Sequence, residues 1–175
     1  KLFKKKYIFC EKPPVTNLKD YNNLKKINNG KIYFNFNRKY SKLYFYLRKL
    51  ISKHKLGNLV YGMFISSKGL AQKNSYKNNW RSKNKFIKTG VFENVSIHSL
   101  DLIEQIFGIK NIRKKLTNNA KVGTAPDTST AEIQINNGNL ITVFATYNSS
   151  LDFFIKLYFK NGIFIYDGKY LSLKY

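Results

Sequence analysis

The chain has 175 residues and a formal net charge of +23, a length that suits one domain or one domain with part of another. Its single cysteine, Cys10, excludes an internal disulfide framework and a multi-cysteine metal site, and we expect no metal ion. No run of about 18 apolar residues predicts a membrane span, and no signal peptide can be recognised, so we expect a soluble cytoplasmic protein.

The basic charge does not by itself identify a nucleic-acid-binding protein. Only four of the 32 basic residues are arginine, whereas recognition of base edges and phosphates favours arginine. The lysines are spread in separate clusters, and the many aromatic residues fall mostly on apolar strand and helix faces. A nucleic-acid-binding module is an alternative, but we favour a solvated, lysine-rich surface.

The first 66 residues are predicted to alternate between strands and helices, because the period of their apolar residues changes along the chain. Pro13 and Pro14 must end the first strand, since each removes an amide donor. Asn17 and Ser41 are suited to cap the two helices. The predicted elements are a strand over 6–10, a helix over 18–28, a strand over 31–36, a helix from Ser41 to about 53 and a strand over 59–66.

The second part of the chain is predicted to hold a long polar loop, one helix and a series of antiparallel strands. Residues 67–89 form the loop, whose length is usually functional or disordered, and a helix over 92–107 should end at Gly108. Asn-Gly and Asp-Gly pairs supply the positive φ angles of three successive tight hairpins. The strands are predicted over 131–135, 140–146, 153–159, 163–166 and 170–174. This order indicates an α+β fold, an open and largely antiparallel sheet with helices on one face.

Lys12 is the first residue that could carry chemistry. It lies in a turn fixed by prolines at the end of a buried strand, an edge where α/β folds bind ligands. Its ammonium could hydrogen-bond a substrate hydroxyl. A turn without a function is the alternative.

His98 is the centre of a second group. Asn94 lies four residues before it and Asp101 three residues after it, so a helix places all three on or near one face. Asp101 could orient the imidazole, and Asn94 could fix a hydroxyl or amide group by hydrogen bonds. A structural histidine that Asp101 satisfies is the alternative.

Six segments of the sequence follow one another in a recognisable order. They are Glu11-Lys12-Pro13 with its continuation to Leu18, Phe36-Asn37-Arg38, residues 55–59, Trp80-Arg81, residues 90–108, and Asp127-Thr128. In this order they resemble segments of the glucose–fructose oxidoreductase, inositol dehydrogenase and rhizopine-catabolism (Gfo/Idh/MocA) family. The fifth is similar to that family's G-G-x-x-x-D/N-x-G-x-H-x-x-D helix.

The resemblance implies a dehydrogenase in which a Rossmann domain binds NAD or NADP and a C-terminal domain binds a sugar or nucleotide sugar. The family's lysine corresponds to Lys12 and its proton-transfer histidine to His98. In the implied reaction, hydride leaves a sugar carbon for nicotinamide, His98 takes the hydroxyl proton, and Lys12 polarises the oxygen. The resemblance also implies substrate binding by Asn94, Arg81 and Asp101, and cofactor binding by Glu11, Lys12, Pro13 and Trp80.

The sequence departs from the family pattern in three places. Asn94 stands where many members carry aspartate, as in the branch that oxidises UDP-N-acetylglucosaminuronic acid, and Ser96 replaces a usual glycine. No G-x-G-x-x-G is present, so we expect the phosphate-binding turn upstream of residue 1. The chain alone is therefore expected to be inactive.

We predict that residues 1–30 are the last strand and helix of a dinucleotide-binding domain, and that residues 31–175 form the C-terminal substrate domain. The sheet carries apolar residues on both faces in places, as at 153–155. Family members commonly oligomerise through this sheet, so the resemblance implies a homo-oligomer. The alternative function is a non-catalytic, sugar-binding or scaffold relative of the family.

Overall fold

The computed structural model describes residues 7–15, 17–27, 30–53 and 56–175, which form two compact units that divide between Asn37 and Arg38. Four positions used in the sequence predictions, Lys6, Thr16, Asn28 and Lys55, lie outside the described residues. No helix in the described ranges has the length and apolar character that a bilayer crossing requires.

The first unit is a β-α-β arrangement of β1 (Ile8–Cys10), α1 (Leu18–Ile27) and β2 (Ile32–Phe34). The two strands pair in parallel, with Ile8 opposite Ile32 and Cys10 opposite Phe34. Asn17 caps α1 as predicted, since its Oδ1 accepts from the backbone N–H of Asp20 at 2.9 Å. The parallel pairing groups β2 with the first unit, whereas the sequence-based division after residue 30 places it in the second.

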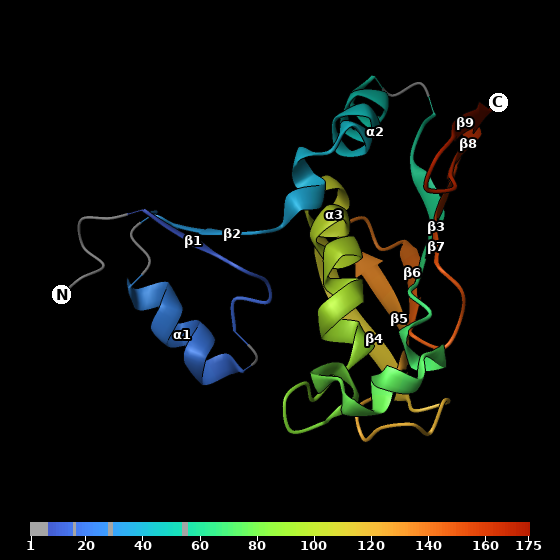
Figure 1. Cartoon of the computed structure of the whole chain (residues 1–175). Helices are drawn as coiled ribbons and strands as arrows, with labels where there is room; N and C mark the ends of the chain where they lie inside the picture. The colour runs from blue at the N-terminus through green and yellow to red at the C-terminus, as the bar shows by residue number, and fades with distance from the viewer. Residues whose placement is uncertain (1–6, 16, 28–29, 54–55) are drawn as a thin grey trace. The chain divides into compact units, whose positions relative to one another are not determined.

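The second unit is a seven-stranded sheet in the order β4-β5-β6-β3-β7-β8-β9, with helices against one face (Figure 1). All neighbouring strands are antiparallel except β3 and β6, so the prediction of a largely antiparallel α+β sheet is confirmed. The strands are β3 (Leu59–Ser67), β4 (Ile109–Thr117), β5 (Thr128–Ile135), β6 (Leu140–Thr146), β7 (Asp152–Phe159), β8 (Gly162–Tyr166) and β9 (Leu171–Lys174).

The three predicted hairpins are confirmed. They join β5 to β6, β7 to β8 and β8 to β9, and their turns contain Gly138 (φ 92°), the pair Lys160-Asn161 and Gly168 (φ 92°). The sequence analysis missed β4 because this edge strand is mostly exposed and rich in Lys and Arg, which removes the alternating apolar pattern. Charged edge strands of this kind discourage pairing with other chains.

Two helices, α2 (Lys42–Ser52) and α3 (Ile97–Phe107), cover one face of the sheet. The core lies between them and the strands, where alternate residues such as Ala131, Ile133 and Ile135 of β5 are buried. Ser41 caps α2 as predicted, because its Oγ accepts from the N–H of Tyr44 at 3.2 Å. The predicted helix over 92–107 exists, but its first turn, η6 (Phe92–Ser96), is a π-helix that leads directly into α3.

Short 3-10 turns connect several of these elements. The first, η2 (Asn37–Tyr40), precedes α2, and three more lie in the long loop after β3. These three are η3 (Leu70–Gln72), η4 (Asn74–Asn78) and η5 (Trp80–Ser82). The segment predicted as a loop is therefore an ordered series of turns.

Candidate functional site

The carboxyl ends of β1 and β2 bring Glu11, Lys12 and Pro13 to the edge of the parallel pair. Asn35, which follows β2, donates from Nδ2 to Glu11 Oε1 at 2.8 Å, and its backbone N–H donates to Cys10 O, also at 2.8 Å. Parallel strands in α/β folds bind ligands beyond this edge. Lys12 is half-buried there and follows the first strand as predicted, but the prediction that this strand is buried is wrong, since Phe9 at its centre is 70% exposed.

The helix formed by η6 and α3 carries Asn94, His98 and Asp101, all of them half-buried. Asn94 lies in the π-helical turn, and His98 and Asp101 lie in α3. π-helical turns are rare and frequently occur at functional sites. Nothing in the pattern of apolar residues distinguishes this turn from α-helix, so the sequence analysis missed it.

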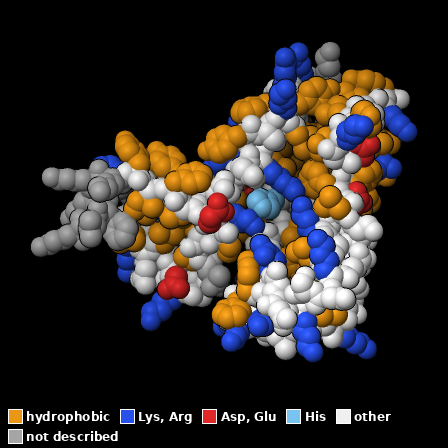
Figure 2. Space-filling view, viewed as in Figure 1, with side chains coloured by type: hydrophobic (Ala, Val, Ile, Leu, Met, Phe, Trp, Pro, Cys, Tyr) orange, Lys and Arg blue, Asp and Glu red, His pale blue; other side chains and the backbone are white. Residues whose placement is uncertain are grey.

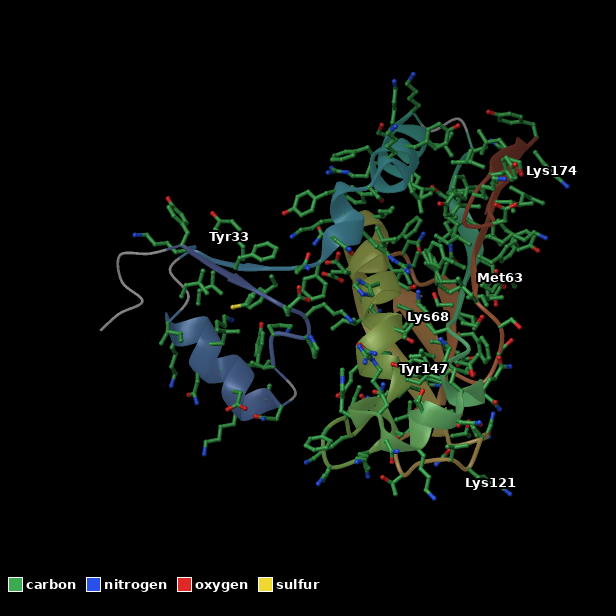
Figure 3. The ribbon with its side chains drawn as sticks, in the orientation of Figure 1. Tyr33, Met63, Lys68, Lys121, Tyr147 and Lys174 are labelled. Carbon is green, nitrogen blue, oxygen red and sulfur yellow. The ribbon has the colours of Figure 1, made fainter. Side chains whose placement is uncertain are left out.

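Tyr147, which follows β6, joins two of the predicted substrate-binding residues. Its side chain is fully buried, and its hydroxyl oxygen accepts a short hydrogen bond from Asn94 Nδ2. The Arg81 guanidinium, a cation, lowers the pKa of the same hydroxyl. Burial raises the pKa of Tyr147, and this effect exceeds the lowering of the same pKa by Asn94 and Arg81. Figure 3 labels Tyr147 near α3 and the turns of the long loop.

Trp80 and Arg81 stand together in η5. The Arg81 guanidinium carbon lies 4.3 Å from the centroid of the Trp80 ring, a cation–π contact. Asn79 fixes the turn, because its Oδ1 accepts from the backbone N–H of Arg81 at 3.0 Å. Ser82 then holds the turn to the segment before β5, since its carbonyl accepts from Thr124 N at 2.7 Å and Ala125 N at 3.0 Å.

Asp101 has different surroundings from those of Asn94. Desolvation by burial raises its pKa, whereas the charge of Lys39 and a hydrogen bond with Gln105 lower it. Its Oδ2 is buried without a hydrogen-bond partner among the described residues. The expected role of Asp101 in orienting His98 stays a prediction.

The start of the second unit holds a desolvated arginine. The Arg38 guanidinium carbon lies 3.9 Å from the centroid of the Phe153 ring, and burial lowers the pKa of Arg38 to about 10. Figure 2 shows many Lys and Arg side chains and few Asp or Glu side chains on the visible face of this unit. Such a surface favours ligands that carry negative charge.

The structure thus brings Asn94 and Arg81 to Tyr147, with Trp80 stacked on Arg81. His98 lies one turn beyond Asn94 on the same helix. Lys12, Glu11 and Pro13 belong to the first unit. The sequence analysis missed Tyr147, because a lone tyrosine between two hairpins carries no signal that distinguishes it from the other 12. Among the described residues, no three His, Cys, Asp or Glu side chains are grouped so that they could hold a metal ion.

Several solved structures with a similar fold are oxidoreductases. Levoglucosan dehydrogenase in complex with NADH and levoglucosan is 16% identical, with a TM-score of 0.84, and the match covers 95% of this chain and 50% of that one. An oxidoreductase from Thermotoga maritima is 16% identical, with a TM-score of 0.79 over 97% of this chain and 55% of that one. GenD2 from gentamicin A biosynthesis, in complex with NAD, is 13% identical, with a TM-score of 0.78 over 92% and 47%.

The chain spans about half the length of these structures, and such low identities show a shared fold. A comparison with curated proteins found no significant match. The profile of the GFO/IDH/MocA C-terminal domain matches residues 44–165, which is more than half of the chain and contains Trp80, Arg81, Asn94 and His98. The chain therefore belongs to the Gfo/Idh/MocA family, and its second unit has the fold of that family's C-terminal domain.

Proposed function

We propose that the chain supplies the substrate-binding part of an NAD(P)-dependent oxidoreductase that acts on a hydroxyl group of a sugar or nucleotide sugar. The observation that carries this proposal is the group of Asn94 and Arg81 at buried Tyr147, with Trp80 stacked on Arg81 and His98 one helical turn from Asn94. Polar groups held in this way suit a ligand rich in hydroxyl groups. Structures of the same fold include complexes with NADH and levoglucosan and with NAD.

Each residue has a separate part in the proposed reaction. His98 accepts the proton of the reacting hydroxyl, and Lys12 hydrogen-bonds to that oxygen as its proton leaves. Asn94 and Arg81 hold further oxygens of the sugar, and Asp101 favours one orientation of the imidazole. A bound nicotinamide would supply the oxidising power by accepting hydride.

The residues present fit one end of a dinucleotide cofactor. Glu11 and Lys12 stand at the carboxyl edge of a parallel strand pair, where such cofactors bind, and Trp80 offers an aromatic face. The sequence has no G-x-G-x-x-G to hold a pyrophosphate. We therefore propose that another dinucleotide-binding part holds most of NAD or NADP, and that this chain alone has no turnover.

The surface of the first unit supports the proposal that another dinucleotide-binding part packs against this chain. Among its described residues six large apolar side chains are exposed, although α1 is amphipathic and should bury one face. Exposed apolar patches mark sites of contact with other protein. The six are Tyr7, Phe9, Leu18, Tyr21, Ile27 and Tyr33.

The proposal is tested with the protein that joins this chain to a dinucleotide-binding domain. NAD and NADP reduction is followed at 340 nm with levoglucosan, D-glucose, myo-inositol and UDP-N-acetylglucosamine. Turnover of at least one of these compounds is expected. Binding of a sugar without turnover would instead favour a non-catalytic sugar-binding relative, and neither binding nor turnover would contradict the proposal.

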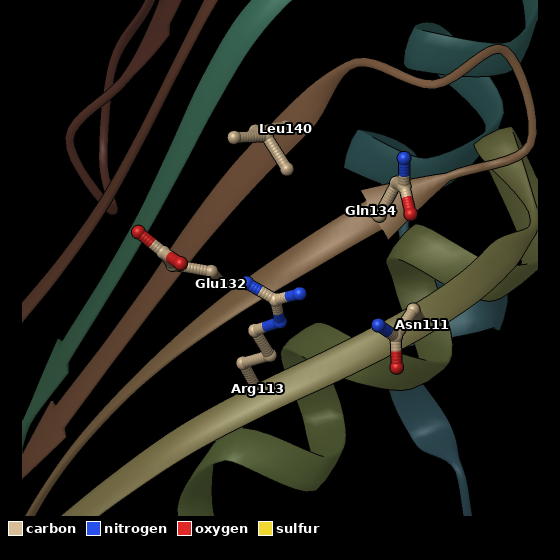
Figure 4. A pocket seen from close by; sticks show the side chains of 5 residues that line it. All are labelled: Asn111, Arg113, Glu132, Gln134 and Leu140. Atoms are coloured by element: carbon tan, nitrogen blue, oxygen red, sulfur yellow. The ribbon is translucent and has the colours of Figure 1, made fainter.

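We also propose that a second copy covers the open face of the sheet. Along this face Ile65 of β3 lies between Phe144 of β6 and Phe154 of β7, which is an apolar row in the middle of the sheet. Toward the β4 edge the face becomes polar, with a hollow of about 170 Å³. Figure 4 shows Arg113 and Glu132 on adjacent strands beside this hollow. An apolar centre with a polar edge is typical of protein interfaces.

A further inference from the structure

Tyr147 has a structural relation to Asn94 that neither the family profile nor the proposed roles assign. We infer that Tyr147 is a positioning residue that fixes the side-chain amide of Asn94, so that the amide oxygen rather than the NH₂ group is turned toward a sugar hydroxyl. This inference rests on the proposed function, because it concerns how the same site recognises its substrate.

The position of the Tyr147 hydroxyl is fixed by packing of its ring and by hydrogen bonds of its backbone. The ring is fully buried in a small core with Tyr76, Val91 and Val95, and it packs edge-on to the Tyr76 ring with the centroids 5.9 Å apart. Its backbone is held as well, because Tyr147 N donates to Asp127 O at 2.8 Å and Tyr147 O accepts from Ala71 N at 2.9 Å. Moving the hydroxyl would therefore disturb the packing of this core.

An asparagine amide has a donor end and an acceptor end, and rotation by about 180° exchanges them. In this structure the Nδ2 end of Asn94 donates to Tyr147. The acceptor end of Asn94 is therefore held on the side away from Tyr147.

This orientation gives Asn94 a polarity similar to that of an aspartate side chain at the same position. A carbonyl oxygen accepts from a sugar hydroxyl, as a carboxylate does, whereas an exposed NH₂ group would donate. A site in which Asn94 were free to rotate would present both ends. Tyr147 thus makes recognition of the sugar directional.

The matched control is Tyr76. It lies in the same core with 3% of its surface exposed, and its hydroxyl donates to the backbone carbonyl of Arg81 at 3.3 Å rather than to Asn94. Tyr147→Phe and Tyr76→Phe each remove one buried hydroxyl and keep the ring. Loss of packing or stability should therefore be similar in the two variants.

The test is a double-mutant cycle in the protein that joins this chain to a dinucleotide-binding domain. The quantity measured, with NADH present, is the Kd of whichever compound binds best among levoglucosan, D-glucose, myo-inositol and UDP-N-acetylglucosamine. Tyr147→Phe should raise that Kd about tenfold, and Tyr76→Phe less than about twofold, with the Kd of NADH unchanged. In an Asn94→Ala background, Tyr147→Phe should add less than about twofold. The Asn94 side-chain amide proton resonance should shift upfield in Tyr147→Phe only.

Three results would overturn the inference: an unchanged sugar Kd in Tyr147→Phe, an equal loss in Tyr76→Phe, or effects of Tyr147→Phe and Asn94→Ala that multiply. Binding with NADH requires no hydride transfer, so these outcomes can be read even if the wild type does not turn over any sugar. In that case the proposed reaction is contradicted, and the Kd values of the variants alone decide whether Tyr147 positions Asn94. A wild type that binds none of the four compounds would overturn both.

Discussion

Gly90 shows how a single residue shapes the site, because it directly precedes the helix that carries Asn94 and His98. Its φ is +55°, and a Cβ atom there would lie 1.9 Å from the carbonyl oxygen of Pro126. That oxygen accepts from Val91 N at 3.0 Å at the start of the helix. Any larger residue must therefore move the helix start away from the segment before β5.

We expect Gly90→Ala to lower the free energy of unfolding by about 3 kcal/mol, from the left-handed backbone and the clash together. Gly138 is the matched control, since its φ is +92° but a Cβ atom there would meet nothing within 4 Å. Gly138→Ala should cost only about 1 kcal/mol. Urea denaturation measures both values, and equal losses would contradict the role of the Pro126 contact.

Asp101 should make stability depend on pH in a defined direction. Burial raises its folded-state pKa above the ordinary value of 3.8, so the unfolded chain ionises at lower pH than the folded protein. The carboxyl group therefore destabilises the fold above its folded-state pKa, and the cost disappears as pH falls below 3.8.

We expect Asp101→Asn to unfold at a higher temperature than wild type near pH 7, because the amide carries no charge to desolvate. The difference should shrink as pH falls and vanish below 3.8, where the wild-type carboxyl group is protonated in both states. Thermal unfolding from pH 3 to 8 tests this. A variant that is less stable than wild type at pH 7 would show that the attraction of Lys39 outweighs desolvation.

Among single residues, the sequence predicts those whose roles depend on partners only three or four positions away in the chain. Asn17 and Ser41 could be predicted as caps because an N-cap interacts with residues only three positions away. The placement of Asn94 and His98 on one helix followed from the same kind of reasoning. Tyr147 could not be found, since its contacts with Asn94 and Arg81 join positions that lie 53 and 66 residues away in the sequence.

Among the elements, α2 depends on its first turn. The Ser41 side chain accepts from Tyr44 N at 3.2 Å, and helix N-termini leave such N–H groups without an intrahelical partner. We expect Ser41→Ala to cost about 1 kcal/mol of unfolding free energy. Ser52, whose hydroxyl donates to Lys49 O at the other end of the helix, is the control, and Ser52→Ala should have little effect. Equal losses would show that Ser41 does not act as a cap.

The elements that sequence reasoning predicted are those with local signals. Each hairpin has Asn-Gly or Asp-Gly at or beside its turn, and glycines 138 and 168 have the positive φ that such turns need. The strand β4 lacks an apolar pattern because it lies at the edge of the sheet. The π-helical turn spans only five residues, too few for its wider period to show in the pattern of apolar residues.

For the whole molecule, the open face of the sheet leads to a prediction about assembly. Ile65 lies between Phe144 and Phe154 on this face, so a charge at its centre should disfavour a buried interface. We expect Ile65→Lys to convert the oligomer to monomer in sedimentation experiments, with the unfolding temperature of the subunit preserved. Phe45, which is 57% exposed on α2, is the control, and Phe45→Lys should leave assembly unchanged. A monomeric wild type would contradict the proposed interface.

The order of the strands could not be predicted from the sequence. Hairpin signals fix which strands pair as neighbours in the chain, but β3 pairs in parallel with β6 and antiparallel with β7, both far from it in sequence. The resemblance to the Gfo/Idh/MocA family supplied the fold where local signals ended, and the match over residues 44–165 confirms that family.

Replacing His98 and Lys12 tests most directly the proposal that these two residues do the chemistry of a sugar dehydrogenase. In the protein that joins this chain to a dinucleotide-binding domain, His98→Asn and Lys12→Met should each lower kcat at least about 100-fold. The Kd of NADH should change less than about threefold, and Lys19→Met, at an exposed lysine of α1, should leave kcat unchanged. Normal turnover in either the His98 or the Lys12 variant would contradict the account.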